Sequence, residues 1–429
     1  MRLLFVTTFQ QSIPHEHIFT RNLWFELRKH PDTYVLSIFL CDKNEDCRLL
    51  FDDKNKEYSL YINSDNPDDI IREIEKVFVE INPSIIHSNM IEGYDIKAAI
   101  KANIPIVLTM HIGGLICARG GGNGLLNWKD EICKNIDFKK CELCCYQDFP
   151  LPKMANILHR LIPLKVEKRL NSYFSIHKYF YISPLLNIRN IINERQYVID
   201  LLRQAHVISA NEKLSGLLNS LNIPNTIIPH GIKQYERVKY PIIKDDTVIK
   251  FFYLARIQYS KGLHILLEAL KGIPTDSYEL HILGDAYSPR KEQMYKRNII
   301  KKAKHANVVF HGFVENDSLS DIIADYHVMI HPTICHEIYG INISEALSLG
   351  RPVVATKCGG PEMQIREDYN GWLVEPNNVA ELKSKIQKII AHKTKLNEMS
   401  SNCHCPNTLK SYVTSLFKLY NNLICTQHK

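Results

Sequence analysis

The sequence predicts an α/β protein built from two doubly wound parallel sheets. Short apolar, β-rich runs alternate with segments of helical spacing in both halves of the chain, and such alternation is typical of parallel sheets covered by helices. A polar stretch without periodicity, 233–247, separates the two alternating regions. At about 150 residues per domain, a chain of 429 residues has room for two or three domains. We therefore expect domains at 1–235 and 248–405.

The first domain begins with the apolar run 3–9, which we interpret as a buried strand rather than a signal peptide. The segment 68–81 has apolar residues at helical spacing, and Asp68 or Asp69 is the expected N-cap. Further strands are expected at 34–40, 57–63, 84–89, 104–111, 205–210 and 226–232, with helices at 18–29, 94–102 and 212–221. The region 112–150 lacks periodicity and is expected to be a functional or metal-bound loop.

The second domain repeats the alternation. Strands are expected at 249–256, 279–285, 308–313, 327–332, 352–356 and 372–376, with helices at 261–271, 288–305, 318–325, 341–349 and 378–391. A final helical pattern covers 408–424. In such folds ligands bind at the carboxyl ends of the strands, so a ligand is expected between the two domains.

Composition places the chain among soluble globular proteins, with 45% hydrophobic and 23% charged residues. The net charge of +7 suits anionic small molecules or a membrane surface at least as well as nucleic acid, and we expect no nucleic-acid partner. No run approaches the roughly 18 apolar residues that span a bilayer, which favours a cytoplasmic location. The segment 152–195 is basic and rich in apolar residues, which fits either peripheral contact with the inner membrane face or a solvated helical face.

Cysteines are concentrated in the region 112–150. Cys141 and Cys144 have the spacing of a chelating pair, and Cys117 and Cys133 precede them. Four thiolates suit tetrahedral zinc, so these four residues form a candidate structural metal site. The alternative is a group of reduced thiols, as is usual in a cytoplasmic protein.

Two cations follow the first strand of the second domain. Arg256 ends the run 249–256, and Lys261 with Gly262 opens the next helix. Cations at the end of a strand and beside the start of a helix suit a diphosphate. The alternative is a pair of solvated surface side chains.

Two glutamates, Glu337 and Glu345, flank a Tyr339-Gly340 turn and the start of a helix at 341–344. Carboxylates accept hydrogen bonds from paired hydroxyls, which suits a polyol, and the first helical turn can donate N–H groups to phosphate. The sequence HGFV at 311–314 ends a strand with Gly312, which would let the backbone approach a flat ring.

Taken in order, these elements resemble the retaining GT-B glycosyltransferases of the family-4 type. The E-x7-E motif corresponds to Glu337 and Glu345, and R-x4-K-G corresponds to Arg256, Lys261 and Gly262. The HGFV turn and the run from Ala346 to Glu362 also match. The resemblance implies two Rossmann-like domains facing across a cleft and a C-terminal helix, 406–429, that packs back toward the first domain.

The resemblance also implies roles for individual residues. Arg256 and Lys261 would stabilise the leaving diphosphate, and Glu337 would face the donor sugar, with His111 near the reaction centre or else purely structural. The implied catalytic residues are thus Glu337, His111, Arg256 and Lys261. The implied donor-binding residues are Arg256, Lys261, Gly312, Phe313, Val314, Glu337, Asn342, Ile343, Ser344 and Glu345. The donor would be a UDP- or GDP-sugar, the acceptor a glycan or a lipid-linked glycan, and no metal would be needed for catalysis.

One region departs from the family pattern. Relatives usually carry a Gly-Gly pair after the first strand, where this chain has Gln10-Gln11-Ser12-Ile13-Pro14-His15. His15 or His17 could supply donors there, and His230 stands where the family has Asn. Two alternatives therefore stay open beside a transferase that acts in polysaccharide or glycolipid synthesis. They are a nucleotide-sugar epimerase of the same shape and a non-catalytic sugar-nucleotide-binding subunit.

Overall fold

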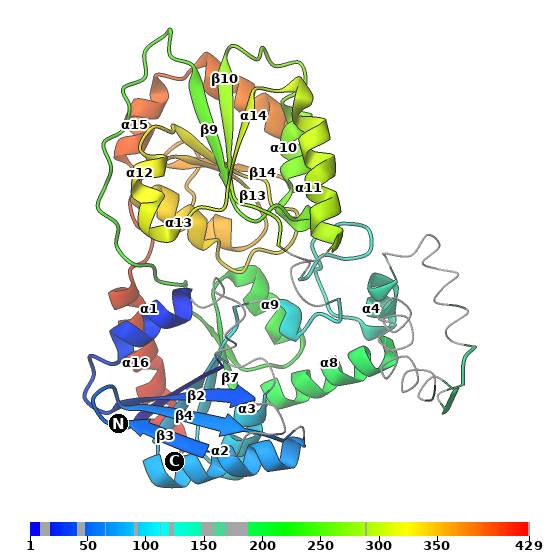
Figure 1. The fold of residues 1–429 in the computed structure, drawn as a ribbon, viewed down its shortest axis with the longest axis vertical. Coiled ribbons are helices and arrows are strands. Elements are labelled where there is room, and N and C mark those ends of the chain that lie inside the picture. Colours follow the sequence, from blue (N-terminus) through cyan, green and yellow to red (C-terminus); the bar gives the residue numbers. More distant parts are fainter. Residues whose placement is uncertain are drawn as a thin grey trace. The chain divides into compact units, whose positions relative to one another are not determined.

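The computed structural model describes residues 1–8, 18–40, 48–64, 66–89, 93–111, 113–119, 124–146, 157, 161–163, 165–166, 169, 188–287 and 290–427. The chain folds as two compact units, shown in Figure 1. The first comprises Met1–Gly120, Lys134–Gly231 and Leu409–Lys429. The second comprises Gly121–Cys133 and Ile232–Thr408. Residues 121–133, which we expected in the N-terminal domain, thus group with the second unit.

The first unit contains, among its described residues, an eight-stranded sheet in the order β3-β4-β2-β1-β5-β6-β7-β8. Its strands are β1 (Leu3–Thr8), β2 (Thr33–Leu40), β3 (Arg48–Asp52), β4 (Glu57–Ile62), β5 (Ile85–Ser88), β6 (Ile106–Thr109), β7 (His206–Ser209) and β8 (Asn225–Ile227). Its helices include α1 (Ile18–Leu27), α2 (Pro67–Ile81), α3 (Tyr94–Lys101), α4 (Phe138–Cys145), α8 (Ile188–Leu202), α9 (Glu212–Ser220) and α16 (Leu409–Gln427). The neighbours pair in parallel except β3, which runs antiparallel to β4.

Sequence periodicity explains most of these elements, and the cap of α2 is a correction. Its N-cap is Asn66, whose side chain accepts a hydrogen bond from the backbone N–H of Asp68 at 3.2 Å. Pro67 occupies the first helical position, where no N–H is needed. Asp68 and Asp69 lie inside the first turn instead, where their negative charge is favourable.

The second unit contains a six-stranded parallel sheet in the order β11-β10-β9-β12-β13-β14. Its strands are β9 (Ile249–Leu254), β10 (Tyr278–Leu283), β11 (Val308–Gly312), β12 (Val328–His331), β13 (Val353–Thr356) and β14 (Gly371–Val374). Its helices include α10 (Leu263–Ala269), α11 (Arg290–Lys302), α12 (Leu319–Ile323), α13 (Ile341–Ser348), α14 (Val379–Ala391) and α15 (Lys395–Ser401). The predicted architecture of two Rossmann-like parallel sheets is confirmed.

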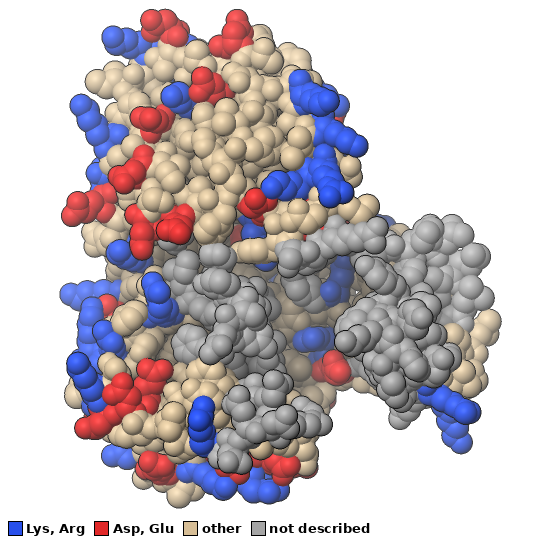
Figure 2. Space-filling model, viewed as in Figure 1, with Lys and Arg blue, Asp and Glu red and all other residues tan. Residues whose placement is uncertain are grey.

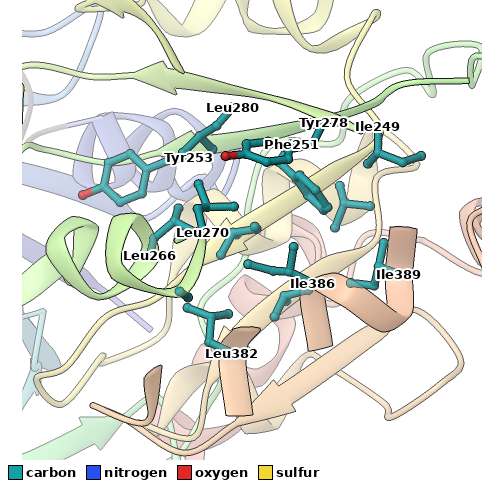
Figure 3. Packing of buried hydrophobic residues seen from close by; sticks show 14 of the residues in the cluster. Ile249, Phe251, Tyr253, Leu266, Leu270, Tyr278, Leu280, Leu382, Ile386 and Ile389 are labelled. Atoms are coloured by element: carbon teal, nitrogen blue, oxygen red, sulfur yellow. The ribbon is translucent and has the colours of Figure 1, made fainter. Parts of the chain in front are cut away.

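The core of the second unit holds β9 in place. Figure 3 shows side chains of β9 packed beside residues of α10 and α14, and the labelled cluster is Ile249, Phe251, Tyr253, Leu266, Leu270, Tyr278, Leu280, Leu382, Ile386 and Ile389. Because β12 pairs directly with β9 in parallel, the carboxyl ends of these two strands meet at one edge of the sheet. The chain that leaves each end therefore builds the candidate site.

Helix α11 carries a concentration of positive charge. Figure 2 shows Lys and Arg side chains gathered over this helix on the face in view. Arg297, Lys301 and Lys302 are exposed there, together with Met294 and Ile300, whose exposed fractions are 54% and 44%. Within the described ranges, no helix is both long and apolar enough to cross a membrane.

Some expectations fall on parts of the chain that are not described. Residues Gln10 to His17 lie outside the described ranges, and so does most of the basic segment 152–195. The expected substitution of His15 or His17 for the Gly-Gly pair, and the membrane contact of 152–195, therefore stay predictions.

Candidate active site

Two cations occupy the turn that follows β9. A short 3-10 helix, η3 (Tyr259–Lys261), ends at Gly262, whose φ of 71° starts α10. Arg256 lies 5.3 Å from the centroid of the Tyr287 ring, a cation–π contact that holds the guanidinium in place. Its positive charge is close enough to lower the pKa of Lys261, although this effect is the smallest of those acting on the lysine. Arg256 and Lys261 thus both follow the carboxyl end of β9.

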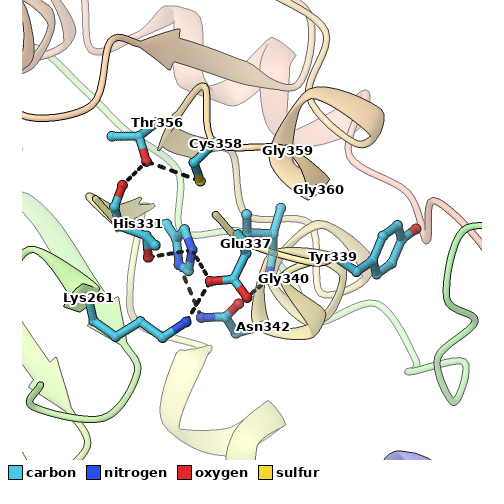
Figure 4. Close-up of polar contacts among 12 residues, drawn as sticks. Lys261, His331, Glu337, Tyr339, Gly340, Asn342, Thr356, Cys358, Gly359 and Gly360 are labelled. Carbon is cyan, nitrogen blue, oxygen red and sulfur yellow. Dashed lines mark hydrogen bonds and ion pairs between the residues drawn. The ribbon is translucent and has the colours of Figure 1, made fainter. Parts of the chain in front are cut away.

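Lys261 makes a direct ion pair with Glu337. Its Nζ lies 2.5 Å from Glu337 Oε2, and the two side chains are 18% and 16% exposed. His331, the last residue of β12, places its Nε2 3.3 Å from the same carboxylate oxygen. Figure 4 shows Lys261 and His331 converging on Glu337. Sequence reasoning assigned Lys261 and Glu337 to different parts of a ligand and did not foresee that they contact each other.

The charges of this cluster are set by burial and by mutual attraction. Burial alone would raise the pKa of Glu337, but the charge of Lys261 and the hydrogen bond from His331 outweigh it and hold the pKa well below its usual range. Burial opposes the charged form of Lys261, yet the carboxylate raises the pKa of the lysine. Burial lowers the pKa of His331. At neutral pH the site therefore holds a lysine cation, a carboxylate and a neutral histidine.

Helix α13 begins beside this cluster, and its first turn is fixed by side-chain contacts. Asn342 donates from Nδ2 to the Leu254 carbonyl at 2.5 Å, and the same atom lies 3.2 Å from Nδ1 of His331. These contacts tie α13 to the ends of β9 and β12. The backbone N–H groups of Ile343 and Ser344, expected to contact phosphate, donate to the Gly340 carbonyl at 3.0 and 3.3 Å.

Glu345 lies one turn further along α13 and is only 7% exposed. The Tyr235 hydroxyl donates to its Oε1 at 3.1 Å. Burial raises the pKa of Glu345 to about 7, although the hydrogen bond from Tyr235 acts in the opposite direction. The pKa values of the two glutamates in the motif are therefore shifted in opposite directions. Glu337 is ionised at neutral pH, whereas Glu345 titrates at about pH 7.

Gln364 holds the two glycine turns together, and sequence reasoning missed it. Its Oε1 accepts from the Ser344 hydroxyl at 2.6 Å, and its Nε2 donates to the carbonyls of Tyr339, Gly340 and Gly360. This buried amide thus joins α13 to the turn after β13. The sequence shows only that Gln364 lies just beyond the matched run that ends at Glu362. Its structural role becomes visible from its tertiary contacts.

The expected base-reading turn follows β11. Gly312 has a φ of 75°, and its carbonyl accepts from the N–H of Gly284 at 2.7 Å. Phe313 is 51% exposed, whereas Val314 packs against the core beside Phe252 and Ile343. The half-exposed ring of Phe313 and the missing side chain at Gly312 are features that suit a planar ligand.

His111 lies in the first unit, two residues after β6. Its Nε2 donates to Oδ1 of Asn89 at 2.6 Å, and its ring contacts those of Phe19 and His230. Burial lowers the pKa of His111 to about 4, so the ring is neutral. The bond to Asn89 places the proton on Nε2 and leaves Nδ1 as an acceptor. Asn89, which directly follows β5, was missed because its partner lies 22 residues away.

Removing the Asn89 side chain should weaken catalysis through His111. We expect Asn89→Ala to lower turnover about 10- to 100-fold, since a ring without its orienting partner is misplaced. Asn89→Asp should instead make turnover depend on pH, because a carboxylate raises the pKa of the ring and converts Nδ1 into a donor as pH falls. Steady-state rates between pH 6 and 9 would show this, and wild-type profiles for both variants would contradict it.

The cysteine group does not form a metal cluster in the structure. Cys141 is buried in a small apolar cluster with Ala118, Tyr146 and Ile192. Cys145 lies near Cys144 and Cys117, and burial with these neighbours raises its pKa to about 12. Within the part of the chain that the structure describes, no three His, Cys, Asp or Glu side chains are grouped to hold a metal ion. The zinc site of Cys117, Cys133, Cys141 and Cys144 therefore receives no support from the geometry.

Residues 124–133 pack against the segment that leads to Glu337 and against η3. Leu126 is buried against Ile334 and Cys335, immediately before Glu337 in the chain. The Asp130 carboxylate accepts from the Tyr259 hydroxyl at 3.0 Å, and its carbonyl accepts from Asn377. These contacts fix η3 and hence the position of Lys261.

Comparison with known proteins agrees with this geometry. Residues 235–404 match the family model "Glycosyl transferases group 1". A lipopolysaccharide 1,2-N-acetylglucosaminetransferase of Salmonella typhimurium is 26% identical over 184 residues, which are 39% of this chain and 48% of that protein. An uncharacterized glycosyltransferase of Methanocaldococcus jannaschii is 28% identical over 199 residues, 43% of this chain and 49% of that one. The matched segments thus span about half the length of these relatives.

Solved structures share the fold over nearly the whole chain. HepE of Anabaena, crystallised with UDP, superposes with a TM-score of 0.64 at 16% identity and covers 98% of this chain and 100% of its own. Sucrose-phosphate synthase of Thermosynechococcus elongatus gives a TM-score of 0.66 at 14% identity, covering 99% and 100%. These likenesses establish the GT-B fold. The match to the model of the glycosyl transferases of group 1 covers residues 235–404, which lie within the second unit.

Proposed function

We propose that this protein transfers a sugar, with retention of configuration, from a nucleotide-diphosphate sugar to an acceptor hydroxyl. The observation that carries the proposal is the cluster at the ends of β9 and β12. There Lys261 is ion-paired with Glu337, and Arg256 is fixed nearby on Tyr287. Preorganised positive charge of this kind stabilises a diphosphate as it leaves.

The proposed reaction follows from the chemistry of these groups. The bond between the anomeric carbon and the diphosphate oxygen breaks, and the negative charge that develops is met by Arg256 and Lys261. The acceptor hydroxyl attacks on the same face, and its proton passes to the leaving phosphate. Glu337 orients sugar hydroxyls, Glu345 accepts from the ribose diol, and the turn at Gly312–Val314 lies along the base. The family resemblance assigns His111, whose ring is neutral, to hydrogen bonding near the reaction centre.

The acceptor is proposed to be a glycan or a lipid-linked glycan in polysaccharide or glycolipid synthesis. The Salmonella relative that acts on lipopolysaccharide supports this class. The basic helix α11, with exposed Met294 and Ile300, suits an anionic membrane surface and supports peripheral contact there. Sedimentation with vesicles of anionic and neutral lipid would test the contact, since binding to neither would exclude it.

The test of the function begins with the donor. Thermal unfolding with UDP-, GDP- and ADP-sugars would identify the ligand, because binding to the folded state raises the midpoint of unfolding. HepE was crystallised with UDP, so UDP-sugars are the first choice. Product analysis with a glycan acceptor follows. Donor turnover without acceptor would favour an epimerase, and binding without turnover would favour a non-catalytic subunit.

A further inference from the structure

Glu345 receives its hydrogen bond from a segment outside the sheet. Tyr235 lies between β8 and β9, in the polar stretch that leads into the second unit's sheet. Its hydroxyl donates to Oε1 of Glu345 at 3.1 Å, and its ring packs against the same core as Val314.

We propose that Tyr235 is a positioning residue for nucleotide binding, whose hydroxyl orients the Glu345 carboxylate so that it accepts from a vicinal diol. The inference rests on the proposed function, because it assigns a supporting residue to the proposed ribose site. A carboxylate offers about four lone-pair positions on two oxygens. The same carboxylate can therefore accept from Tyr235 at Oε1 and from hydroxyl groups of a ligand.

The charge of the pair explains why this hydrogen bond matters. Burial raises the pKa of Glu345 to about 7, and the bond from Tyr235 limits that rise. Burial and the nearby carboxylates of Glu345 and Asp317 raise the pKa of Tyr235, so the phenol keeps its proton and remains a donor. Asp317 is the further charged group that acts on Tyr235. A carboxylate accepts from a diol better than a carboxylic acid does, so occupancy depends on this balance.

The experiment measures the dissociation constant of UDP, and of GDP in parallel, by calorimetry from pH 6 to pH 9.5. The proteins are wild type, Tyr235→Phe, Glu345→Gln and the double variant. Glu345→Gln keeps the shape but does not titrate, so it reports the pH dependence of the nucleotide's own phosphates. Relative to Glu345→Gln, wild-type affinity should rise as pH passes through about 7, because the carboxylate forms there.

Tyr235→Phe should bind UDP about 10-fold more weakly than the wild type near pH 7, because it lacks a hydrogen bond to a charged group. Part of this loss should persist at pH 9, because the ionised carboxylate is then no longer oriented by the phenol. In the Glu345→Gln background the same change should have little effect. In steady-state kinetics with a nucleotide sugar, the Tyr235→Phe substitution should act mainly by raising KM. Unfolding midpoints for each variant confirm that the fold persists.

Three outcomes would overturn the inference. A Tyr235→Phe profile that overlays the wild type would show that the hydroxyl is dispensable, while leaving the proposed function intact. An equal loss of UDP affinity from Tyr235→Phe in the wild-type and Glu345→Gln backgrounds would show that the tyrosine acts through packing and not through Glu345. Failure of the wild type to bind either nucleotide at any pH would overturn the proposed function together with the inference.

Discussion

Replacing Arg256 or Lys261 by alanine is expected to lower turnover of the nucleotide sugar about 100-fold or more. Each cation lies at the carboxyl end of β9, where the diphosphate is proposed to leave. Each would stabilise negative charge that develops fully only as the bond between the sugar and the diphosphate breaks. The effect should therefore appear in kcat more than in KM. Steady-state kinetics with a saturating acceptor would measure it.

The two substitutions should differ in their effect on stability. Lys261→Ala leaves Glu337 as a buried carboxylate without its lysine partner, so the midpoint of unfolding should fall. Arg256→Ala removes only a contact with the Tyr287 ring and should leave that midpoint nearly unchanged. Lys357→Ala is a matched control, because Lys357 pairs with Glu375 at the surface, where ion pairs contribute little. Near-normal turnover of both Arg256→Ala and Lys261→Ala would remove the basis for the diphosphate assignment.

The place of Arg256, Lys261 and Glu337 at one edge of the sheet was predictable, because all three residues follow strand ends in a parallel sheet. Arg256 and Lys261 follow β9, and Glu337 follows β12. The sequence cannot show that β9 and β12 are neighbours, yet the repeated alternation predicts that all their carboxyl ends share one edge. Function-bearing residues at those ends are therefore brought together by topology rather than by their spacing in the chain.

The unpredicted contacts are those that join segments distant in sequence. The Lys261–Glu337 pair spans 76 residues, and the Tyr235–Glu345 bond spans 110. Neither contact leaves a local pattern, because a motif marks a residue within its own segment and not the distant residue that it contacts. The antiparallel strand β3 was missed for a related reason. Its residues are exposed along its whole length, so it lacks the alternation that marks a half-buried strand.

The cysteine pattern is a prediction from local spacing that the contacts of the described residues do not support. Cys141 and Cys144 lie on α4, an element that the sequence did not predict. The helix turns Cys141 into an apolar cluster, whereas Cys133 groups with the second unit. Chelate spacing is thus compatible with a short amphipathic helix whose buried face includes a thiol.

Substituting Gly262 by alanine should disrupt the site through the backbone. The glycine has a φ of 71°, and an added Cβ would lie 1.8 Å from the Pro332 carbonyl oxygen. Pro332 directly follows His331, so relief of this clash must move η3 or the end of β12, and Lys261 and Glu337 with them. We expect a loss of about 3 kcal/mol in the free energy of unfolding, as for other strained backbone positions. Turnover should fall at least as far as in Lys261→Ala.

The chain offers a matched control for this substitution in Gly216, which is exposed within α9 and where an added Cβ meets nothing within 4 Å. Gly216→Ala should stabilise the protein by about 0.5–1 kcal/mol, because alanine is the better helix former. Urea unfolding of both variants would separate the two effects. A Gly262→Ala protein as stable and active as Gly216→Ala would show that the close approach of η3 to Pro332 is not required. The Lys261–Glu337 ion pair would then have to be positioned by other contacts.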